Sequence, residues 1–219
     1  MRFSDHAILT WIIWCSCLTA ALAAVVAGNW TVAFVALITL ATSVLPVVVA
    51  RYAGLVVPRA FIAAIVFFIF ATLFLGEVLD FYNRFWWWDI ALHGGSAVGF
   101  GLIGFVAVFM MFQGDRFAAP HLAICFFSMC FAVFIGTMWE IFEFSMDTLF
   151  NLNMQKSGLP DTMGDLIVDV TGAFLGAALG YLYLRGRERA FLTHLITEFV
   201  ERNPRFFGKA REKRHTDRM

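Results

Sequence analysis

Charged residues are scarce in this chain. Lys, Arg, Asp and Glu together make up only 15% of its 219 residues, whereas 61% are hydrophobic and 26 are phenylalanine. A soluble domain of this length does not need so much apolar surface, and apolar runs of about 20 residues match the thickness of a bilayer. The composition therefore excludes a soluble globular protein and indicates an integral membrane protein, for which we expect no nucleic-acid partner.

The four cysteines form no metal-binding or redox motif. They lie inside apolar runs, with no C-x-x-C pair and no histidine in zinc-finger order: Cys15, Cys17, Cys125 and Cys130. Such cysteines typically behave as small residues that face the core or the lipid. Internal repeats, low-complexity segments and signs of a second domain are also lacking.

Six apolar segments predict an all-α polytopic fold with six transmembrane helices. The expected ranges are 7–27, 30–50, 61–80, 89–112, 118–147 and 165–184, which together form one transmembrane domain over residues 1–184. The segment Ala21-Leu22-Ala23 resembles a signal-peptidase site, but the basic region before it holds only Arg2, beside Asp5. An uncleaved first helix is therefore favoured.

Basic residues are segregated along the chain although the net charge is zero. If both termini are cytoplasmic, fourteen of the sixteen Lys and Arg residues lie inside, and only Arg84 and Lys156 lie outside. The positive-inside rule then predicts a multi-pass protein of the bacterial plasma (inner) membrane with both termini in the cytoplasm.

The C-terminal segment, residues 185–219, is predicted to be a cytoplasmic amphipathic helix followed by a basic tail. Within 188–202 the apolar residues recur with a helical period: Phe191, Leu192, Leu195, Ile196, Phe199 and Val200. This pattern favours a helix lying on the inner leaflet, and the basic run at 209–215 would favour anionic lipid.

Acidic residues gather at the opposite, outer ends of helices three to six, whereas helices one and two hold no ionisable residue. The outer acids are Glu77, Asp80, Asp89, Glu140, Glu143, Asp147, Asp161, Asp165 and Asp169. Within each helix they recur at intervals of three or four residues, so each set lies along one helical face.

Four of these faces include an ionisable residue about one turn below the membrane surface. These residues are Glu77, His93, Glu140 and Asp169. Ionisable groups at that depth cost free energy and normally face the interior of a helix bundle. We therefore expect helices three to six to form a bundle around one polar pocket that opens outward.

Asp89 and His93 stand one turn apart after three tryptophans. Trp86, Trp87 and Trp88 fit an interfacial aromatic belt, which places the two polar residues just inside the membrane. A neighbouring carboxylate would fix the tautomer of the imidazole. Small residues follow on this helix and in the sixth, where Gly172-x3-Gly176-x3-Gly180 is typical of close helix contacts.

Purely structural roles compete for some of these acids. Thr162-x-x-Asp165 fits a capping box, which by itself would explain Asp165. Glu77 and Asp80 can simply end the third helix, and Asp147 fits a solvated position in a polar stretch.

The order of these motifs resembles a known family. Asp89-x3-His93, then Trp139-Glu140-x2-Glu143, then Asp161-Thr162-x2-Asp165-x3-Asp169-x2-Gly172 is similar to the YjdF-type bacterial inner-membrane proteins and, more distantly, to VanZ-like proteins. The resemblance covers about residues 77–184 and implies a polytopic plasma-membrane protein without a settled activity. It supports the pocket more than any one reaction.

Three functions fit the predicted pocket. The first is an enzyme acting on a lipid or lipid-linked substrate, with His93, Asp89 and Glu140 as catalytic residues. A divalent cation (Mg²⁺, Ca²⁺ or Mn²⁺) would be held by ligands from five residues: His93, Glu140, Glu143, Asp165 and Asp169. Glu77, Asp80 and Asp161 would line the pocket. Zinc is disfavoured because it usually takes more than one histidine.

The second function is a proton- or cation-coupled transporter, and the third is a non-catalytic membrane subunit that binds a cation or a membrane-protein partner. Transport is disfavoured because the inner halves of helices three to six hold no ionisable residue apart from their cytoplasmic ends.

Overall fold

The computed structural model describes residues 7–112, 115, 119–187 and 191–208. Across these ranges the regular secondary structure is helical, without β-strands, so the predicted all-α fold is confirmed. Six of the described helices are long and apolar enough to cross a membrane, as the sequence predicted. The chain forms two compact units, Met1–Leu92 and His93–Met219.

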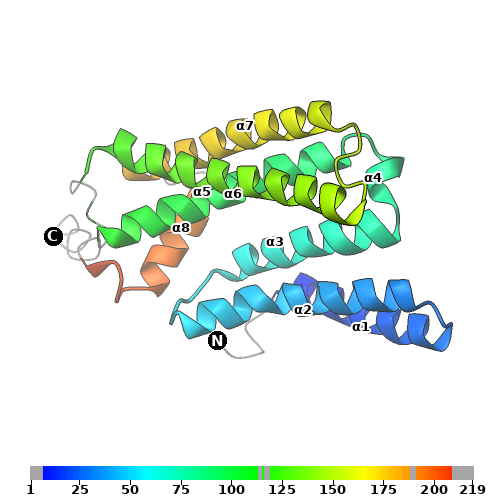
Figure 1. The fold of residues 1–219 in the computed structure, drawn as a ribbon. Coiled ribbons are helices and arrows are strands. Elements are labelled where there is room, and N and C mark those ends of the chain that lie inside the picture. Colours follow the sequence, from blue (N-terminus) through cyan, green and yellow to red (C-terminus); the bar gives the residue numbers. More distant parts are fainter. Residues whose placement is uncertain (1–6, 113–114, 116–118, 188–190, 209–219) are drawn as a thin grey trace. The chain divides into compact units, whose positions relative to one another are not determined.

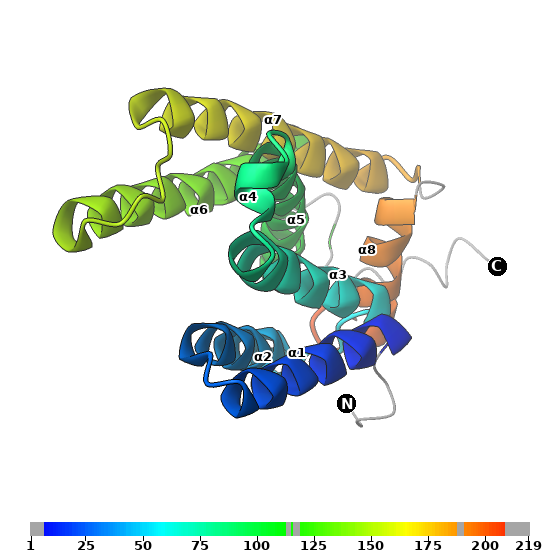
Figure 2. The same ribbon diagram turned by 90° about the vertical axis from the view of Figure 1, so that its right-hand side faces the viewer.

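The first unit contains α1 (Ile8–Val26), α2 (Trp30–Tyr52), α3 (Arg59–Ile69), η2 (Phe70–Val78) and α4 (Phe81–Arg84). Figures 1 and 2 show α1, α2 and α3 lying side by side. Their shared core includes Trp14, Cys17 and Val66. The indole of Trp14 donates a hydrogen bond of 3.0 Å to the Ser43 hydroxyl, which satisfies a polar group inside this apolar core.

The third predicted span changes its helical form halfway. The sequence predicted one helix over 61–80, but α3 continues directly into the π-helix η2, which ends at Val78. Gly76 lies in η2 against the ring of Tyr82, and a side chain at position 76 would collide with that ring. Asp80 then takes a left-handed conformation (φ 60°), which ends the helix and begins α4.

The second unit consists of α5 (Trp88–Met111) from His93 onward, with α6 (His121–Phe150), α7 (Leu159–Leu184) and α8 (Phe191–Arg202). The predicted start of the fifth span at residue 118 lies outside the described residues. Figures 1 and 2 show α6 and α7 running alongside each other.

Small residues let α5 and α7 approach backbone to backbone. A Cβ atom placed on Gly176 would lie 2.6 Å from the carbonyl oxygen of Val98, and one placed on Gly101 would lie 3.0 Å from the Cα of Gly176. A Cβ atom placed on Gly172 would likewise lie 2.8 Å from the carbonyl oxygen of Gly94. The predicted contact role of the glycine series in the sixth span is therefore confirmed.

Helix α8 packs on the end of the second unit (Figure 1). Its residues Ile196 and Val200 are buried and join the core built by α5, α6 and α7. The sequence assigned this apolar face to the inner leaflet. The structure instead covers it with protein, because α5 and α7 supply a continuous apolar surface that includes Phe109 and Tyr183. The basic run at 209–215 lies outside the described residues.

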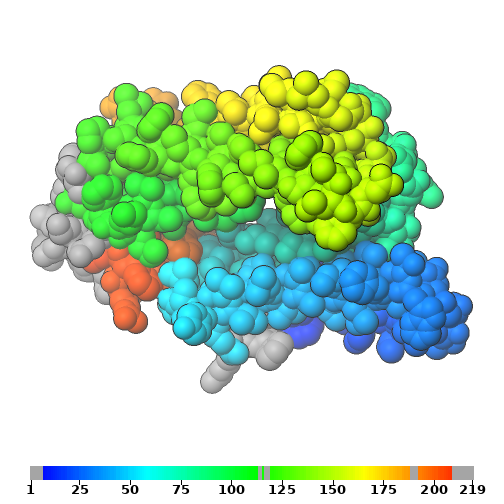
Figure 3. Space-filling view, in the orientation of Figure 1, coloured from blue at the N-terminus to red at the C-terminus, as the bar shows by residue number. Residues whose placement is uncertain are grey.

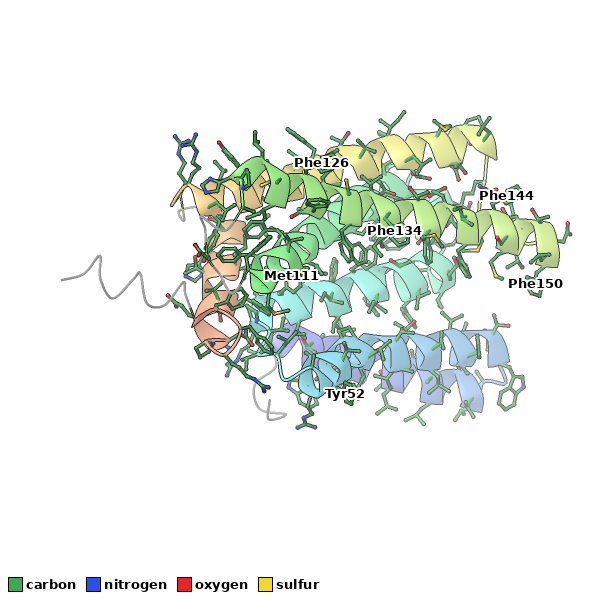
Figure 4. The ribbon with its side chains drawn as sticks, turned by 60° about the vertical axis from the view of Figure 1, so that its left-hand side comes forward. Tyr52, Met111, Phe126, Phe134, Phe144 and Phe150 are labelled. Atoms are coloured by element: carbon green, nitrogen blue, oxygen red, sulfur yellow. The ribbon has the colours of Figure 1, made fainter. Side chains whose placement is uncertain are left out.

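The outer surface of α6 is apolar along its whole length. In the space-filling view α6 covers much of one face of the second unit (Figure 3). Figure 4 labels four of its phenylalanines, which are 58–64% exposed: Phe126, Phe134, Phe144 and Phe150. Such a surface is expected where a helix faces acyl chains.

Candidate metal centre

His93 lies between two carboxylates from two other helices. Its Nδ1 is 3.3 Å from Oδ1 of Asp169 on α7, and its Nε2 is 3.8 Å from Oε1 of Glu140 on α6. The first separation is within hydrogen-bonding range, whereas the second is too long for a hydrogen bond. Three helices of the second unit thus bring an imidazole and two carboxylates together.

These side chains are almost fully withdrawn from the surface. Glu140 is 3% exposed, Asp169 2%, Asp165 5% and His93 8%. Both carboxylate oxygens of Glu140 and Oδ2 of Asp169 have no hydrogen-bond partner. Buried polar atoms are nearly always hydrogen-bonded, so three orphaned carboxylate oxygens around one imidazole are unusual and point to a ligand.

Asp165 also lies near His93. One of its carboxylate oxygens lies within 4.8 Å of a ring nitrogen of His93. The capping-box interpretation of Thr162 and Asp165 is wrong, because α7 begins at Leu159, with Gly158 as its N-cap, rather than at residue 165. Asp165 is therefore an interior residue of α7, one turn before Asp169 and buried. No helix cap explains its carboxylate.

Gly136 on α6 makes room for Asp169. A Cβ atom at position 136 would lie 2.8 Å from the Asp169 Cγ and closer still to Oδ2. The sequence analysis did not single out this residue. The sequence does indicate a place near the site, because Gly136 precedes Glu140 by four residues and so lies on the same face of α6.

The group has no basic residue nearby in its own helices. The sequences of α5, α6 and α7 contain neither Lys nor Arg. Within these three helices, positive charge for the buried carboxylates can come from His93, and bound protons or a bound cation would add to it. A buried charge without such compensation costs several kcal/mol, so a positive partner would stabilise the folded state.

Asp89 lies in the first turn of α5, one helical turn before His93 on the same helix, as its spacing predicted. Trp86 and Trp87 just before it are exposed, as an interfacial belt requires, whereas Trp88 is half-buried.

Three other predicted residues make local contacts. Glu143 accepts a hydrogen bond of 2.9 Å from the indole of Trp139, one turn earlier. Asp161 accepts one of 3.1 Å from the Lys156 amide in the preceding loop. Asp147, predicted to be solvated, instead accepts the backbone amides of Met154 and Gln155, at 2.7 and 2.8 Å, and so organises the loop between α6 and α7.

Glu77 and Asp80 belong to the first unit and are exposed. The side chain of Asp80 accepts a hydrogen bond of 2.6 Å from the side-chain amide of Asn83. Its backbone carbonyl accepts hydrogen bonds from the backbone amides of Asn83 and Arg84 at the start of α4. This gives Asp80 a turn-forming role. A place for either residue in the pocket stays a prediction.

The chemistry of the second-unit group suits a divalent cation. Carboxylate oxygens and one imidazole nitrogen are ligands for Mn²⁺ and related ions, and oxygen-rich sites also suit Mg²⁺ and Ca²⁺. The four cysteines form no disulfide; Cys17 and Cys125 are buried, and Cys15 and Cys130 are exposed.

Comparisons with known proteins agree with this description. An uncharacterized protein from Thermotoga maritima is 33% identical over 114 residues, which are 52% of this chain and 57% of that relative. The chain thus spans just over half the length of the relative that it matches. No solved structure matches the chain. The more distant similarity to VanZ-like proteins stays a prediction.

The sequence profile of one membrane-protein family matches residues 8–186, which include all six candidate spans. The expected membership of a membrane family without an assigned activity is confirmed. The chain belongs to the family described as predicted membrane protein (DUF2238).

Proposed function

We propose that this membrane protein binds a divalent cation with His93, Glu140 and Asp165, held in place by Asp169, and that it is an enzyme acting on a lipid or lipid-linked substrate. The observation that carries the proposal is Glu140, which is 3% exposed and has no hydrogen-bond partner on either carboxylate oxygen, although it faces an imidazole. A cation between Glu140 and the Nε2 of His93 would satisfy these oxygens.

The cation that fits best is Mn²⁺. Carboxylate ligands favour a hard ion such as Mg²⁺, Ca²⁺ or Mn²⁺, and among these Mn²⁺ is the transition metal, which binds an imidazole nitrogen most readily. Zinc sites usually use several histidine or cysteine ligands, which this group lacks.

An enzyme is favoured because three protein ligands do not fill the coordination sphere of a hard cation. Such ions take about six ligands or more, so positions remain for water or for an oxygen of a substrate. These three residues lie on helices that are long and apolar enough to cross a membrane, so a lipid headgroup is the nearest source of such an oxygen. Asp89, one turn from His93, would assist as the sequence predicted.

A non-catalytic subunit that holds a structural cation is the second candidate. The observation that favours it is the burial of all four side chains, none more than 8% exposed. Structural metal sites are closed, whereas catalytic sites keep an open position.

The test of cation binding is a titration of purified, chelator-treated protein with Mn²⁺, followed by electron paramagnetic resonance of the free ion. We expect stoichiometric binding that Glu140→Gln weakens at least tenfold. Glu143→Gln is the matched control, because Glu143 lies one turn further along α6 and is already bonded to Trp139. Absence of saturable binding by the unaltered chain would overturn the proposal.

A second measurement separates the enzyme from the subunit. The protein is reconstituted into vesicles of phosphatidylethanolamine, phosphatidylglycerol and cardiolipin, with Mn²⁺ or with chelator, and the lipids are followed by mass spectrometry. In parallel, ¹⁷O-labelled water reports whether bound Mn²⁺ carries water. A catalytic site requires bound water, whereas a fully closed coordination sphere favours the structural cation.

A further inference from the structure

We infer that Asp169 is a positioning residue. Gly136 leaves the space that the Asp169 side chain occupies, and Asp169 holds His93 with the proton on Nδ1, so that Nε2 and Glu140 face the same cation. This inference rests on the proposed function, since it assigns separate roles within that site.

The two nitrogens of His93 are in different situations. Nδ1 lies 3.3 Å from Asp169 Oδ1, close enough for Nδ1–H to donate, whereas Nε2 lies 3.8 Å from Glu140 Oε1. A neutral imidazole has one N–H and one lone pair. With the proton on Nδ1, the lone pair of Nε2 is directed to the side of Glu140.

The separation of 3.8 Å between Nε2 and Oε1 suits two ligands of one ion. Ligand atoms that each lie about 2.1 Å from a cation can be up to about 4.2 Å apart. A lone pair and an orphaned carboxylate oxygen would otherwise repel each other. The unpartnered oxygens of Glu140 are consistent with a cation between them and the imidazole.

The position of Asp169 depends on the absence of a side chain at residue 136. A Cβ there would lie 2.8 Å from the Asp169 Cγ and 3.1 Å from its Cβ, so the carboxylate would have to turn away from His93 or α7 would have to shift. Asp169 is 2% exposed, so it has no alternative space at the surface. Gly136 therefore acts on His93 through Asp169.

Carboxylates that orient a metal-binding histidine are a general feature of metal sites. Their loss typically lowers metal affinity about 10- to 100-fold without removing a ligand. We expect Asp169→Ala and Gly136→Ala each to weaken Mn²⁺ binding by about that factor, with one ion still bound per chain. Asp169→Asn keeps an oxygen that can accept from Nδ1–H, so its loss should be smaller than that of Asp169→Ala.

A readout independent of metal is the tautomer of His93. The full chain in detergent micelles is labelled with ¹⁵N-histidine, and the His93 signals are assigned by comparison with His93→Gln. In metal-free protein we expect a proton on Nδ1, and we expect the preference for this nitrogen to disappear in Asp169→Ala and Gly136→Ala. Gly99→Ala is the matched control, because a Cβ at Gly99 meets nothing within 4 Å.

A double-mutant cycle tests whether Gly136 works through Asp169. In the Asp169→Ala background, Gly136→Ala should no longer change Mn²⁺ affinity. An undiminished effect in that background would show that residue 136 acts by another route. It would overturn the inference that Gly136 acts by leaving space for Asp169. Circular dichroism and thermal unfolding identify any variant that does not fold, in which case Asp169→Asn carries the test.

The outcomes separate the two proposals. If the unaltered chain binds no Mn²⁺, the proposed function fails, and the tautomer measurement stands by itself. If Mn²⁺ binds and Glu140→Gln weakens it, two results refute only the positioning role. One is a metal-free His93 with a proton on Nε2 and none on Nδ1. The other is unchanged affinity in Asp169→Ala.

Discussion

His93 Nδ1 and Asp169 Oδ1 are 3.3 Å apart although 76 positions separate the two residues in the chain. The contact joins α5 to α7 at the level where Glu140 of α6 approaches the other ring nitrogen. Because no Lys or Arg lies in these helices, we expect the balance of charge at this contact to affect both stability and the proposed ion binding.

Glu140→Gln should raise the stability of the metal-free protein. The substitution removes a buried carboxylate that has no hydrogen-bond partner. The folded state is then relieved of a desolvation cost of about 1–3 kcal/mol. Excess Mn²⁺ should reverse the order, because at 100 times the dissociation constant a bound ligand stabilises the folded state by about 2.7 kcal/mol. Thermal unfolding in detergent with and without Mn²⁺ measures both effects. A lower melting temperature of the variant in chelator would contradict this account.

Gly176→Ala should destabilise the second unit by about 1–3 kcal/mol, because the new methyl group would overlap the Val98 carbonyl. Gly99→Ala, also in a helix interior but with open space, should be neutral or stabilising by up to about 1 kcal/mol. Denaturant unfolding of the two variants checks the difference. Equal effects would mean that α5 and α7 are not in backbone contact.

Asp147→Ala should release the loop between α6 and α7. Two backbone donors, the amides of Met154 and Gln155, would lose their acceptor, at a local cost of about 1–3 kcal/mol. Hydrogen exchange should therefore accelerate at these two amides. In Asp161→Ala the faster exchange should instead appear at Lys156, whose amide bonds Asp161. The same pattern of exchange in both variants would argue against separate contacts of Asp147 and Asp161 with the loop.

Ile196→Ala should cost about 2–5 kcal/mol, as expected for a buried aliphatic side chain. Glu198→Ala breaks only the pair with Arg202, which is partly exposed, and should cost at most about 1 kcal/mol. Thermal unfolding compares the two. If Ile196→Ala had no effect in detergent, the apolar face of α8 would rest on lipid after all, as its sequence pattern suggested.

The orientation of the spans can be checked with reporter fusions in a bacterial host. We expect alkaline phosphatase fused after Leu152 to be active, because the loop containing Lys156 is predicted to lie outside. Green fluorescent protein at the C-terminus should fluoresce, since the termini are predicted to be cytoplasmic. Reversal of both signals would refute the orientation.

The number and approximate positions of the spans could be predicted because length and apolarity alone specify a membrane helix. The boundaries were less accurate. The start of α7 was placed at Asp165, since Thr162 resembles a cap, but Pro160 suits the first turn of a helix and the helix begins at Leu159. The π-helical form of η2 had no sequence signal, because hydrogen-bond pattern does not alter the apolar composition.

The members of the site could be proposed from spacing, which places residues on one helical face. Spacing does not reveal what lies opposite that face. The pairing of Asp169 with His93, and of Gly136 with Asp169, depends on how α5, α6 and α7 are rotated against one another. The partner of α8 was missed for the same reason, since an amphipathic face looks alike whether it rests on lipid or on protein.

The backbone contact of α5 with α7 at Gly101 and Gly176 also limits how the protein can evolve. A relative that gains a methyl group at either position has to spread the two helices, and the spread would separate the imidazole from its carboxylate two turns away. Divergence among relatives should therefore concentrate on the exposed apolar side of α6, while these two glycines should change only together with His93 and Asp169.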